Sequence, residues 1–424
     1  MSAETLPRAT VRASASWVRV AVAMFAVGWG ANQFSPMLVV YRHELGLGAG
    51  AVAGLFAIYA VTLIPGLLIG GPASDRFGRR AVVLPFVALS PLATLLLVLG
   101  PRSLPMIAAG RALAGLCSGV VFGSATTWVQ ELSHGSGLSA RRAALALTAG
   151  FGLGPVVAAV LAQWAGDPLV VPYLPHLAIG SAALAIVWPA PATAARPAAG
   201  RRPWPPPAVR TLRFWLTVAP VAPVVFGSVS VAIVVLPEEV TSARTLSVGF
   251  AGLMTALAFM AGVAVQPFAR RLETRWPYAA SAGGLACAAA GAAVSIAAVT
   301  PDVRALAEVG AVLLGLAYGL CLVSGLRQAE LLAGPGDRGA VVACYLALSY
   351  VGFATAYAVA GLNSVVGRAG AFVALAGTAA ALTVWMTWQS RRSLVLRRPV
   401  AAPGKASECQ RTACVPVRNA GNCP

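Results

Sequence analysis

The stretch "GGPASDRFGRR", residues 70–80, places four charged side chains within six positions of a chain in which only 10% of the residues are charged. A long apolar run lies on each side of it. Charged residues are excluded from the hydrocarbon core of a bilayer and gather in the short loops between membrane helices. The stretch therefore indicates a turn between two membrane-spanning helices.

The composition extends this interpretation to the whole chain of 424 residues, of which 58% are hydrophobic. A soluble protein has roughly 45–50% apolar and about 25% charged residues. Apolar stretches of about 20 residues fit helices that cross a bilayer, whereas the strands of a membrane β-barrel alternate in hydrophobicity. We therefore expect an all-α membrane protein with twelve transmembrane helices, at 17–40, 51–71, 81–100, 106–128, 143–165, 172–190, 214–236, 247–268, 278–299, 305–326, 340–361 and 370–388.

The basic residues are distributed unevenly among the predicted loops. Twelve spans place both termini on one side, which carries 25 of the 31 Lys and Arg residues; five lie in the opposite loops and Arg111 lies inside a span. Positive charge stays on the cytoplasmic side. We therefore expect a multi-pass protein of the bacterial plasma membrane with both termini in the cytoplasm. The net charge of +18 reflects this orientation and contact with anionic lipids rather than with nucleic acid.

The longest polar interruption, residues 191–210, divides the chain into two halves. Its prolines favour extended chain, and it separates the sixth predicted span from the seventh. A degenerate copy of the opening stretch, "GVAVQPFARR" at 262–271, follows the eighth span, and we align Gly71 with Gly262. The predicted segments are a cytoplasmic N-terminal tail (1–16), an N-terminal six-helix bundle (17–190), a cytoplasmic linker (191–213), a C-terminal six-helix bundle (214–388) and a cytoplasmic C-terminal tail (389–424).

The residues of the opening stretch have distinct expected roles. Gly71 permits the close approach of a helix, Gly78 permits a tight turn, and Asp75 can accept hydrogen bonds from an arginine or a helix N-terminus. An ordinary charged turn explains the arginines but neither the aspartate nor the glycine spacing. The pattern Gly-x-x-x-Asp-Arg-x-Gly-Arg-Arg resembles the signature loop of the major facilitator superfamily, and the resemblance covers about residues 17–390.

This resemblance implies two groups of functional residues. In that superfamily the loop acts as a conformational latch between the halves, and the matching residues here are Gly71, Asp75, Arg76, Gly78, Arg79 and Arg80. A charge network at the interface of the halves is implied after the fourth and tenth spans, with the matching residues Glu131, Arg141, Arg142, Glu330 and Arg338.

Arg111 lies inside the fourth predicted span, in "GRALAGLCSG". An arginine near the centre of a membrane helix costs at least about 2.5 kcal/mol, which favours a position facing the bundle interior, although outward snorkelling to the nearer membrane surface is an alternative. The sequence resembles a second facilitator motif, in which the arginine takes part in proton coupling. Asn32 and Gln33 lie at a similar depth in the first span, and a cluster of these amides with Arg111 could orient a substrate.

The fifth span contains "GFGLGPVVAA", residues 150–159. Gly150 and Gly154 permit close packing, and Pro155 removes a backbone donor and bends the helix. This segment resembles the motif of drug/proton antiporters, in which the kink governs opening of the cavity, but Ala158 and Ala159 replace glycines of that motif.

No other constellation indicates chemistry. Glu238 and Glu239 follow Pro237 in an outer loop and are expected to be solvated, and no coupling residue is identified. The cysteines have neither metal-ligand spacing nor histidine partners, so we expect no metal and no cofactor. Aromatic residues in or near spans that line the cavity of relatives are more often packing residues than ligand contacts; they are Trp29, Trp128, Phe226, Tyr318, Tyr345 and Tyr350.

These observations favour a secondary transporter that exports a small amphiphilic compound or drug by alternating access. The expected driving force is a proton gradient, and the expected partners are the substrate, protons and membrane lipids, with the protein acting as a monomer. A facilitator that imports a small metabolite by symport or uniport is an alternative, and a membrane-embedded sensor is a further one. No catalytic cluster and no G-x-x-x-x-G-K-[ST] phosphate-binding loop is present, so we expect no enzyme.

Overall fold

The computed structural model describes residues 8–133, 139–193, 204–240, 248–334 and 337–396. The tails predicted at 1–16 and 389–424 and the predicted linker therefore lie partly outside the described residues. Within the described ranges the chain contains helices and no strand, which confirms the predicted all-α fold class.

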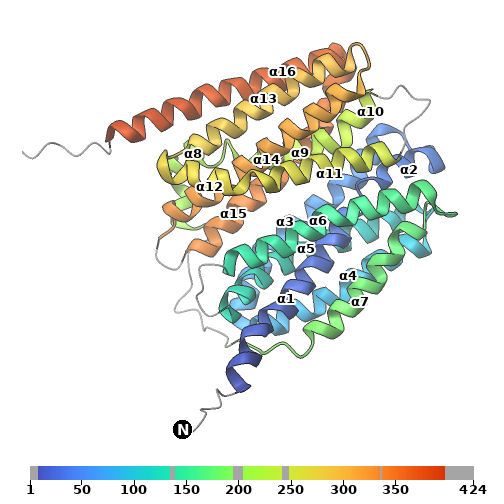
Figure 1. Cartoon of the computed structure of the whole chain (residues 1–424), viewed down its shortest axis with the longest axis vertical. Coiled ribbons are helices and arrows are strands. Elements are labelled where there is room, and N and C mark those ends of the chain that lie inside the picture. The colour runs from blue at the N-terminus through green and yellow to red at the C-terminus, as the bar shows by residue number, and fades with distance from the viewer. Residues whose placement is uncertain (1–7, 134–138, 194–203, 241–247, 335–336, 397–424) are drawn as a thin grey trace, which may run out of the picture.

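The helices fall into two bundles that lie side by side (Figure 1). The N-terminal bundle contains α1 (Arg8–Asn32), α2 (Met37–Leu45), α3 (Ala49–Phe77), α4 (Arg79–Leu99), α5 (Leu104–Leu132), α6 (Ser139–Trp164), the 3-10 turn η1 (Val171–Tyr173) and α7 (Leu174–Val187). The C-terminal bundle contains η2 (Pro207–Arg210), α8 (Leu212–Thr217), α9 (Ala222–Ser230), the π-helical turn η3 (Val231–Val235), α10 (Leu236–Val240), α11 (Val248–Ala264), α12 (Gln266–Arg275), α13 (Ala279–Val299), α14 (Arg304–Leu332), α15 (Arg338–Val351) and α16 (Ala354–Leu396).

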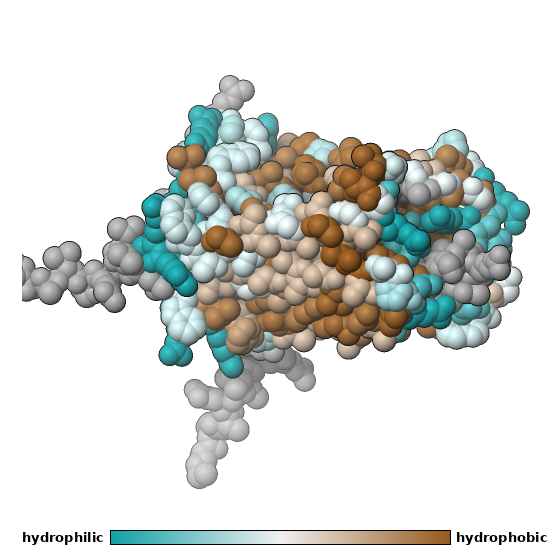
Figure 2. Space-filling view, turned by 90° about the horizontal axis from the view of Figure 1, so that it is seen from above, coloured by the Kyte–Doolittle hydropathy of each residue, from teal (hydrophilic) through white to brown (hydrophobic). Residues whose placement is uncertain are grey.

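The surface of the molecule fits a membrane. In Figure 2 an apolar band separates hydrophilic atoms at the two ends of the molecule. Nine ranges of the described residues are long and apolar enough to cross a bilayer: Gly50–Phe77, Arg79–Leu99, Leu104–Leu132, Leu145–Trp164, Leu212–Val240, Val248–Arg275, Ala279–Val299, Arg304–Leu332 and Arg338–Arg392. The chain is therefore a multi-pass membrane protein.

The number of spans is not settled by these ranges. The first helix, α1, and the shorter apolar helix at Val171–Val187 fall outside them. The last range contains a non-helical residue, Gly367, with φ 74°, which divides α16 into two parts. These features accord with twelve spans, and that count stays a prediction.

The two bundles share one packing scheme. Gly115 and Gly119 of α5 lie against the backbone of α3, and Gly315 and Gly319 of α14 lie against the backbone of α11 in the same way. A Cβ atom at these glycines would lie within 2.1–2.2 Å of the carbonyl oxygens of Tyr59, Leu63, Ala258 and Gly262 respectively, so no larger side chain fits. The close crossing of α3 and α5 therefore has a counterpart in that of α11 and α14, with the glycines 200 positions further along the chain.

This packing corrects the predicted alignment of the two halves. Gly119 faces Leu63 and Gly319 faces Gly262, so the structural counterpart of Gly262 is Leu63 rather than Gly71. The predicted alignment is wrong by eight residues, about two helical turns. Pairs of arginines follow the ends of α3 and α11, and these pairs produced a false match. The backbone contacts of the glycines, in contrast, fix the register of the helices.

We call the end of the bundles that carries Asp75, Arg79 and Glu131 the latch end, and the end that carries Arg42 and Glu238 the far end. The helix α3 runs from the far end to the latch end, and α4 begins there after one intervening residue, Gly78. The latch end is the one that the sequence predicts to face the cytoplasm.

Candidate functional site

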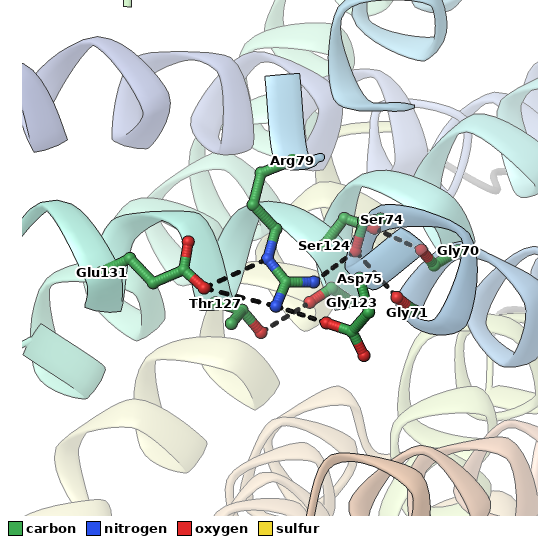
Figure 3. A network of polar contacts seen from close by, with 9 residues as sticks. All are labelled: Gly70, Gly71, Ser74, Asp75, Arg79, Gly123, Ser124, Thr127 and Glu131. Carbon is green, nitrogen blue, oxygen red and sulfur yellow. Dashed lines mark hydrogen bonds and ion pairs between the residues drawn. The ribbon is translucent and has the colours of Figure 1, made fainter. Parts of the chain in front are cut away.

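A buried arginine organises the latch end. Gly78 adopts φ +91°, a backbone conformation that residues other than glycine rarely adopt. This conformation ends α3 and lets α4 begin at Arg79. The guanidinium of Arg79, only 8% exposed, lies between two carboxylates (Figure 3). Its Nη2 atom is 2.5 Å from Asp75 Oδ1 and 3.3 Å from Glu131 Oε1. One cation therefore joins α3, α4 and α5.

Two serines complete this network (Figure 3). Arg79 Nη1 donates to Ser74 Oγ at 2.5 Å, and Ser74 Oγ donates in turn to the carbonyl of Gly71 at 2.8 Å. Ser124 of α5 donates to the carbonyl of Gly70 at 2.9 Å. A buried charge is stable only when it is paired and hydrogen-bonded, and these contacts supply both conditions within the N-terminal bundle.

The remaining residues of the opening stretch point elsewhere. Arg76 is exposed and lies 5.2 Å from the ring centre of Phe77, and Arg80 donates to the carbonyl of Trp188 at 3.0 Å. The close helix approach predicted at Gly71 is wrong, because a Cβ there would meet open space. The neighbouring Gly70 makes that approach, since its Cβ would lie 2.8 Å from Val120 Cα.

Those residues of the implied charge network whose side chains are described form no ion pair with one another. Glu131 contacts Arg79, and the side chain of Arg141 lies outside the described part of the chain. Arg142 lies 4.3 Å from the ring centre of Trp17. Glu330 and Arg338 are exposed near the ends of α14 and α15, and no ion pair between them is formed among the residues that the structure describes.

The C-terminal bundle contains a buried charged residue of its own, Glu273 of α12, which sequence reasoning missed. Its buried carboxylate accepts from the backbone N–H of Tyr278 at 2.9 Å and of Ala280 at 3.2 Å, and from the side-chain amide of Gln328. A carboxylate thus caps the N-terminus of α13, where it also interacts favourably with the helix dipole. The glycine repeat between α5 and α14 was the signal that could have located it.

Arg111 lies inside the N-terminal bundle and is 2% exposed, so outward snorkelling is wrong. It donates to the carbonyls of Ala31 at 3.2 Å and Leu55 at 3.3 Å. Its guanidinium carbon lies 4.2 Å and 4.6 Å from the ring centres of Phe34 and Tyr59. Since α1 ends at Asn32, the carbonyl of Ala31 lacks its usual helical partner, and Arg111 supplies one.

The amides of Asn32 and Gln33 bind other partners than Arg111. Asn32 Nδ2 donates to the carbonyl of Phe151 in α6 at 3.1 Å, and Gln33 Nε2 donates to Thr94 Oγ1 in α4 at 3.2 Å. Thr94 Oγ1 lies 2.7 Å from His176 Nδ1 in α7. These polar groups connect the end of α1 directly to α6 and α4, and through Thr94 to α7.

The kinked-helix motif lies against α1. A Cβ at Gly150 would lie 2.3 Å from the carbonyl oxygen of Phe25, and one at Gly154 would lie 2.8 Å from that of Trp29. Pro155 lies within α6, one residue beyond this contact. The glycines therefore allow α6 to approach α1 closely while α6 also packs on α11 of the other bundle.

A continuous set of buried aromatic rings lies where the bundles meet. We call it the aromatic cluster; the N-terminal bundle contributes Phe56, Phe122 and Phe151, and the C-terminal bundle contributes Phe226, Phe259, Tyr318, Tyr350 and Phe353. Two contacts cross between the bundles: Phe56 to Phe353, with ring centres 4.8 Å apart, and Phe151 to Phe259, at 6.1 Å.

Phe226 is the hub of the aromatic cluster. It stacks on Tyr350 at 4.3 Å and also contacts Phe353 at 5.1 Å and Tyr318 at 5.8 Å. Three of the six aromatic residues singled out in the sequence thus lie in the cluster. Of the others, Trp128 donates to the carbonyl of Pro191, Tyr345 donates to that of Cys321, and Trp29 packs on Phe25.

At the far end an ion pair joins the two bundles. Arg42 of α2 lies 3.0 Å from Glu238 of α10. The adjacent Glu239 accepts from Asn363 at 2.6 Å and lies 3.7 Å from Arg368, both in its own bundle. The prediction that these glutamates are solvated is wrong, since their side chains are only 19% and 18% exposed. Both glutamates lie in helix α10, where Glu238 meets Arg42 of α2 and Glu239 meets Arg368 of α16.

The sequence model of the Major Facilitator Superfamily matches residues 20–226, and solved transporter structures share the fold over nearly the whole chain. Residues 20–226 of the chain are identified as a Major Facilitator Superfamily sequence. This match, together with the transporter folds, confirms the expectation of a transporter rather than an enzyme.

Within the superfamily, one curated relative is similar in part. Multidrug resistance protein D of Escherichia coli (strain K12) is 32% identical over 141 residues, which are 33% of this chain. The match spans only 35% of that protein's length.

The fold is similar to that of other transporters of known structure. A mutant of the nucleoside transporter NupG matches with a TM-score of 0.66 at 10% identity, over 88% of this chain and 99% of that one. A POT family transporter in complex with 5-aminolevulinic acid matches with a TM-score of 0.72 at 12% identity, over 89% of this chain and 96% of that one. Similarity at this level of identity establishes the fold alone.

Replacing Arg79 with alanine should slow transport strongly, because it leaves the carboxylates of Asp75 and Glu131 without their shared cation. Hydrogen bonds to charged groups are worth about 1.5–3 kcal/mol each, so we expect a loss of roughly tenfold or more in initial rate. Asp75→Asn should cost less, since Asp75 is half-exposed and Glu131 remains. Transport rates normalised to membrane-inserted protein measure this effect. Wild-type flux in Arg79→Ala would refute the latch role. Arg271→Gln, an exposed arginine of α12, is the control.

Proposed function

We propose that this superfamily member is a secondary active transporter of the plasma membrane that exports a small amphiphilic compound in exchange for protons. The observation that carries the proposal is the aromatic cluster. It lies between the bundles, where transporters built from two halves bind their substrates. Aromatic faces bind flat apolar groups and attract cations, so such a site favours a lipophilic compound with an aromatic or cationic part.

The charges of the molecule support the same class of substrate. The acidic residues that contact arginines lie at the ends of the bundles, at the latch end (Asp75, Glu131) and at the far end (Glu238, Glu239). The rings of the aromatic cluster contact one another, and the polar groups they offer are tyrosine hydroxyls. A site of this kind selects by shape and apolar surface rather than by a salt bridge. The partial similarity to multidrug resistance protein D agrees with this selection.

We infer alternating access from the contacts between the bundles at the far end and in the middle of the interface. The ion pair between Arg42 and Glu238 closes the far end, and the two ring contacts of the aromatic cluster hold the middle of the bundles together. Separation of the bundles at either end would expose the rings to that side. Exchange with protons supplies the energy for export against a gradient.

Export should be measured in proteoliposomes with a lipophilic cationic dye such as ethidium. We expect dye accumulation in inside-out vesicles that depends on an imposed pH gradient and collapses with an uncoupler. Accumulation that is independent of the direction of the pH gradient would contradict the exchange mechanism. Gradient-driven uptake of a nucleoside or peptide in the opposite direction, without dye transport, would favour the importer instead.

Phe226→Ala should raise the KM for the dye by about tenfold, because it removes a stacked partner and two further ring contacts, each worth about 0.5–1.5 kcal/mol. Phe372→Ala is the matched control, since Phe372 is equally buried but lies in α16 outside the aromatic cluster. The control should lower thermal stability and leave KM unchanged. An equal rise of KM in both variants would mean that the cluster only supports the fold.

A further inference from the structure

We propose that a groove beside the latch network binds the phosphate group of an anionic membrane phospholipid. The groove has a volume of about 480 Å³ and lies between the start of α4 and the segment that follows α7. Its walls are mostly apolar, with Phe77, Leu84, Pro85 and Trp188 among them. Arg80 is the charged residue in the wall.

The groove holds two polar groups that lack partners. The Nε atom of Arg80 and the hydroxyl of Thr193 are both buried and have no hydrogen-bond partner among the described residues. A buried donor without a partner costs about 1–3 kcal/mol, and few such groups remain in native proteins without a bound molecule to satisfy them. Both groups donate hydrogen bonds, and one of them is cationic, so the missing partner is an anionic acceptor.

The position of Arg80 is fixed by the protein before any ligand binds. Its Nη2 atom donates to the carbonyl of Trp188 at 3.0 Å, just beyond the end of α7. Arg19 of α1 donates to the carbonyl of Pro189 at 3.1 Å, and Trp128 of α5 donates to that of Pro191 at 3.1 Å. Three donors thus hold the segment after α7 against the bundle. The groove is therefore a built feature with a rigid polar edge.

The combination of walls and polar edge identifies the ligand as amphiphilic. Leu84, Pro85 and Ala88 lie on one face of α4, at the spacing of successive helical turns, and continue from the polar edge toward the apolar band of the surface. Trp188 is exposed beside Arg80, and tryptophan prefers the boundary between headgroups and acyl chains. A phosphate at Arg80 and Thr193 with an acyl chain along α4 satisfies both parts of the groove. A free phosphate would satisfy only the polar edge.

This site differs from the latch network although the two arginines are adjacent. Arg79 points inward and its charge is balanced by two carboxylates, whereas the contact of Arg80 is with a neutral carbonyl. Arg80 therefore keeps an unbalanced positive charge beside an apolar groove. Anionic lipids attract such a group, by about 1 kcal/mol for each basic residue near the membrane surface.

The test is native mass spectrometry of the purified full-length chain, titrated separately with phosphatidylglycerol, phosphatidylcholine and inorganic phosphate. We expect phosphatidylglycerol to bind most tightly, with an affinity about tenfold lower in Arg80→Gln. Thr193→Val keeps the shape of the side chain and removes only the hydroxyl, so it should lower the affinity less than Arg80→Gln does. It also tests the site if Arg80→Gln fails to fold. Arg271→Gln removes an exposed arginine of α12 and should bind as the wild type does.

Three results would overturn the proposal. Equal binding of phosphatidylglycerol and phosphatidylcholine would show that no anion is selected. Equal losses in Arg80→Gln and Arg271→Gln would show that only the total charge of the protein matters. Displacement of the lipid by millimolar inorganic phosphate would identify a soluble anion as the ligand. The measurement needs no transport, so its outcome is independent of the proposed export function.

Discussion

Arg111→Ala should abolish coupled transport and lower the free energy of unfolding by about 2–5 kcal/mol. The substitution leaves the buried carbonyls of Ala31 and Leu55 without their donor and removes a cation that lies against two aromatic rings. It also releases the end of α1 from α3 and α5, which are helices of the same bundle. Dye export in proteoliposomes and thermal unfolding in detergent measure the two effects.

Arg111→Lys distinguishes the role of charge from that of geometry. A lysine keeps the positive charge but cannot reach both carbonyls with one planar group, so we expect partial retention of transport if charge matters most. Arg304→Ala, at the exposed start of α14, is the control and should leave both measurements unchanged. Normal coupled flux in a stable Arg111→Ala protein would remove Arg111 from the transport mechanism.

Cross-linking the two bundles at the far end should stop transport almost completely. Arg42 and Glu238 belong to different bundles and their side chains meet at 3.0 Å. Cysteines at both positions, joined by a short bis-methanethiosulfonate reagent, would prevent separation of the bundles at that end. Transport should return when a reducing agent cleaves the link. Each variant that carries only one of the two introduced cysteines, treated in the same way, shows the effect of the reagent alone.

The adjacent ion pair provides a matched control for this experiment. Glu239 and Arg368 lie 3.7 Å apart at the same end, but both belong to the C-terminal bundle. The same link between cysteines at these positions should leave transport close to that of the unlinked variant. If both links block transport equally, the block does not arise from fixing one bundle to the other.

Much of the fold was predictable because hydropathy and the loop arginines are local properties of the sequence. The long apolar runs predicted membrane helices, and the turn at residues 70–80 lies where α3 ends and α4 begins. The alignment of the halves was not predictable from the same pattern. It depends on contacts such as that of Gly319 with Gly262, which join helices far apart in the sequence.

The candidate site was predictable only in part for a similar reason. The glycine spacing and the aspartate pointed to Asp75 and its neighbours, but not to which arginine turns inward, because Arg79 and Arg80 have the same local context. Glu238 was misplaced because a glutamate after a proline resembles a solvated loop until its partner, Arg42, is known from the other bundle. Glu273 was missed because its ligands are mainly backbone N–H groups.

The two ring contacts that cross between the bundles have a consequence for the unloaded carrier. Phe56 contacts Phe353 and Phe151 contacts Phe259, so the protein's own rings occupy the places that a planar substrate would take. Separating the bundles without a bound substrate breaks these ring contacts. A substrate that binds between the rings replaces them with contacts of its own. Separation of the bundles in the empty protein is therefore unfavourable, and under the proposed exchange of substrate for protons the same rings would limit proton leakage through futile cycling.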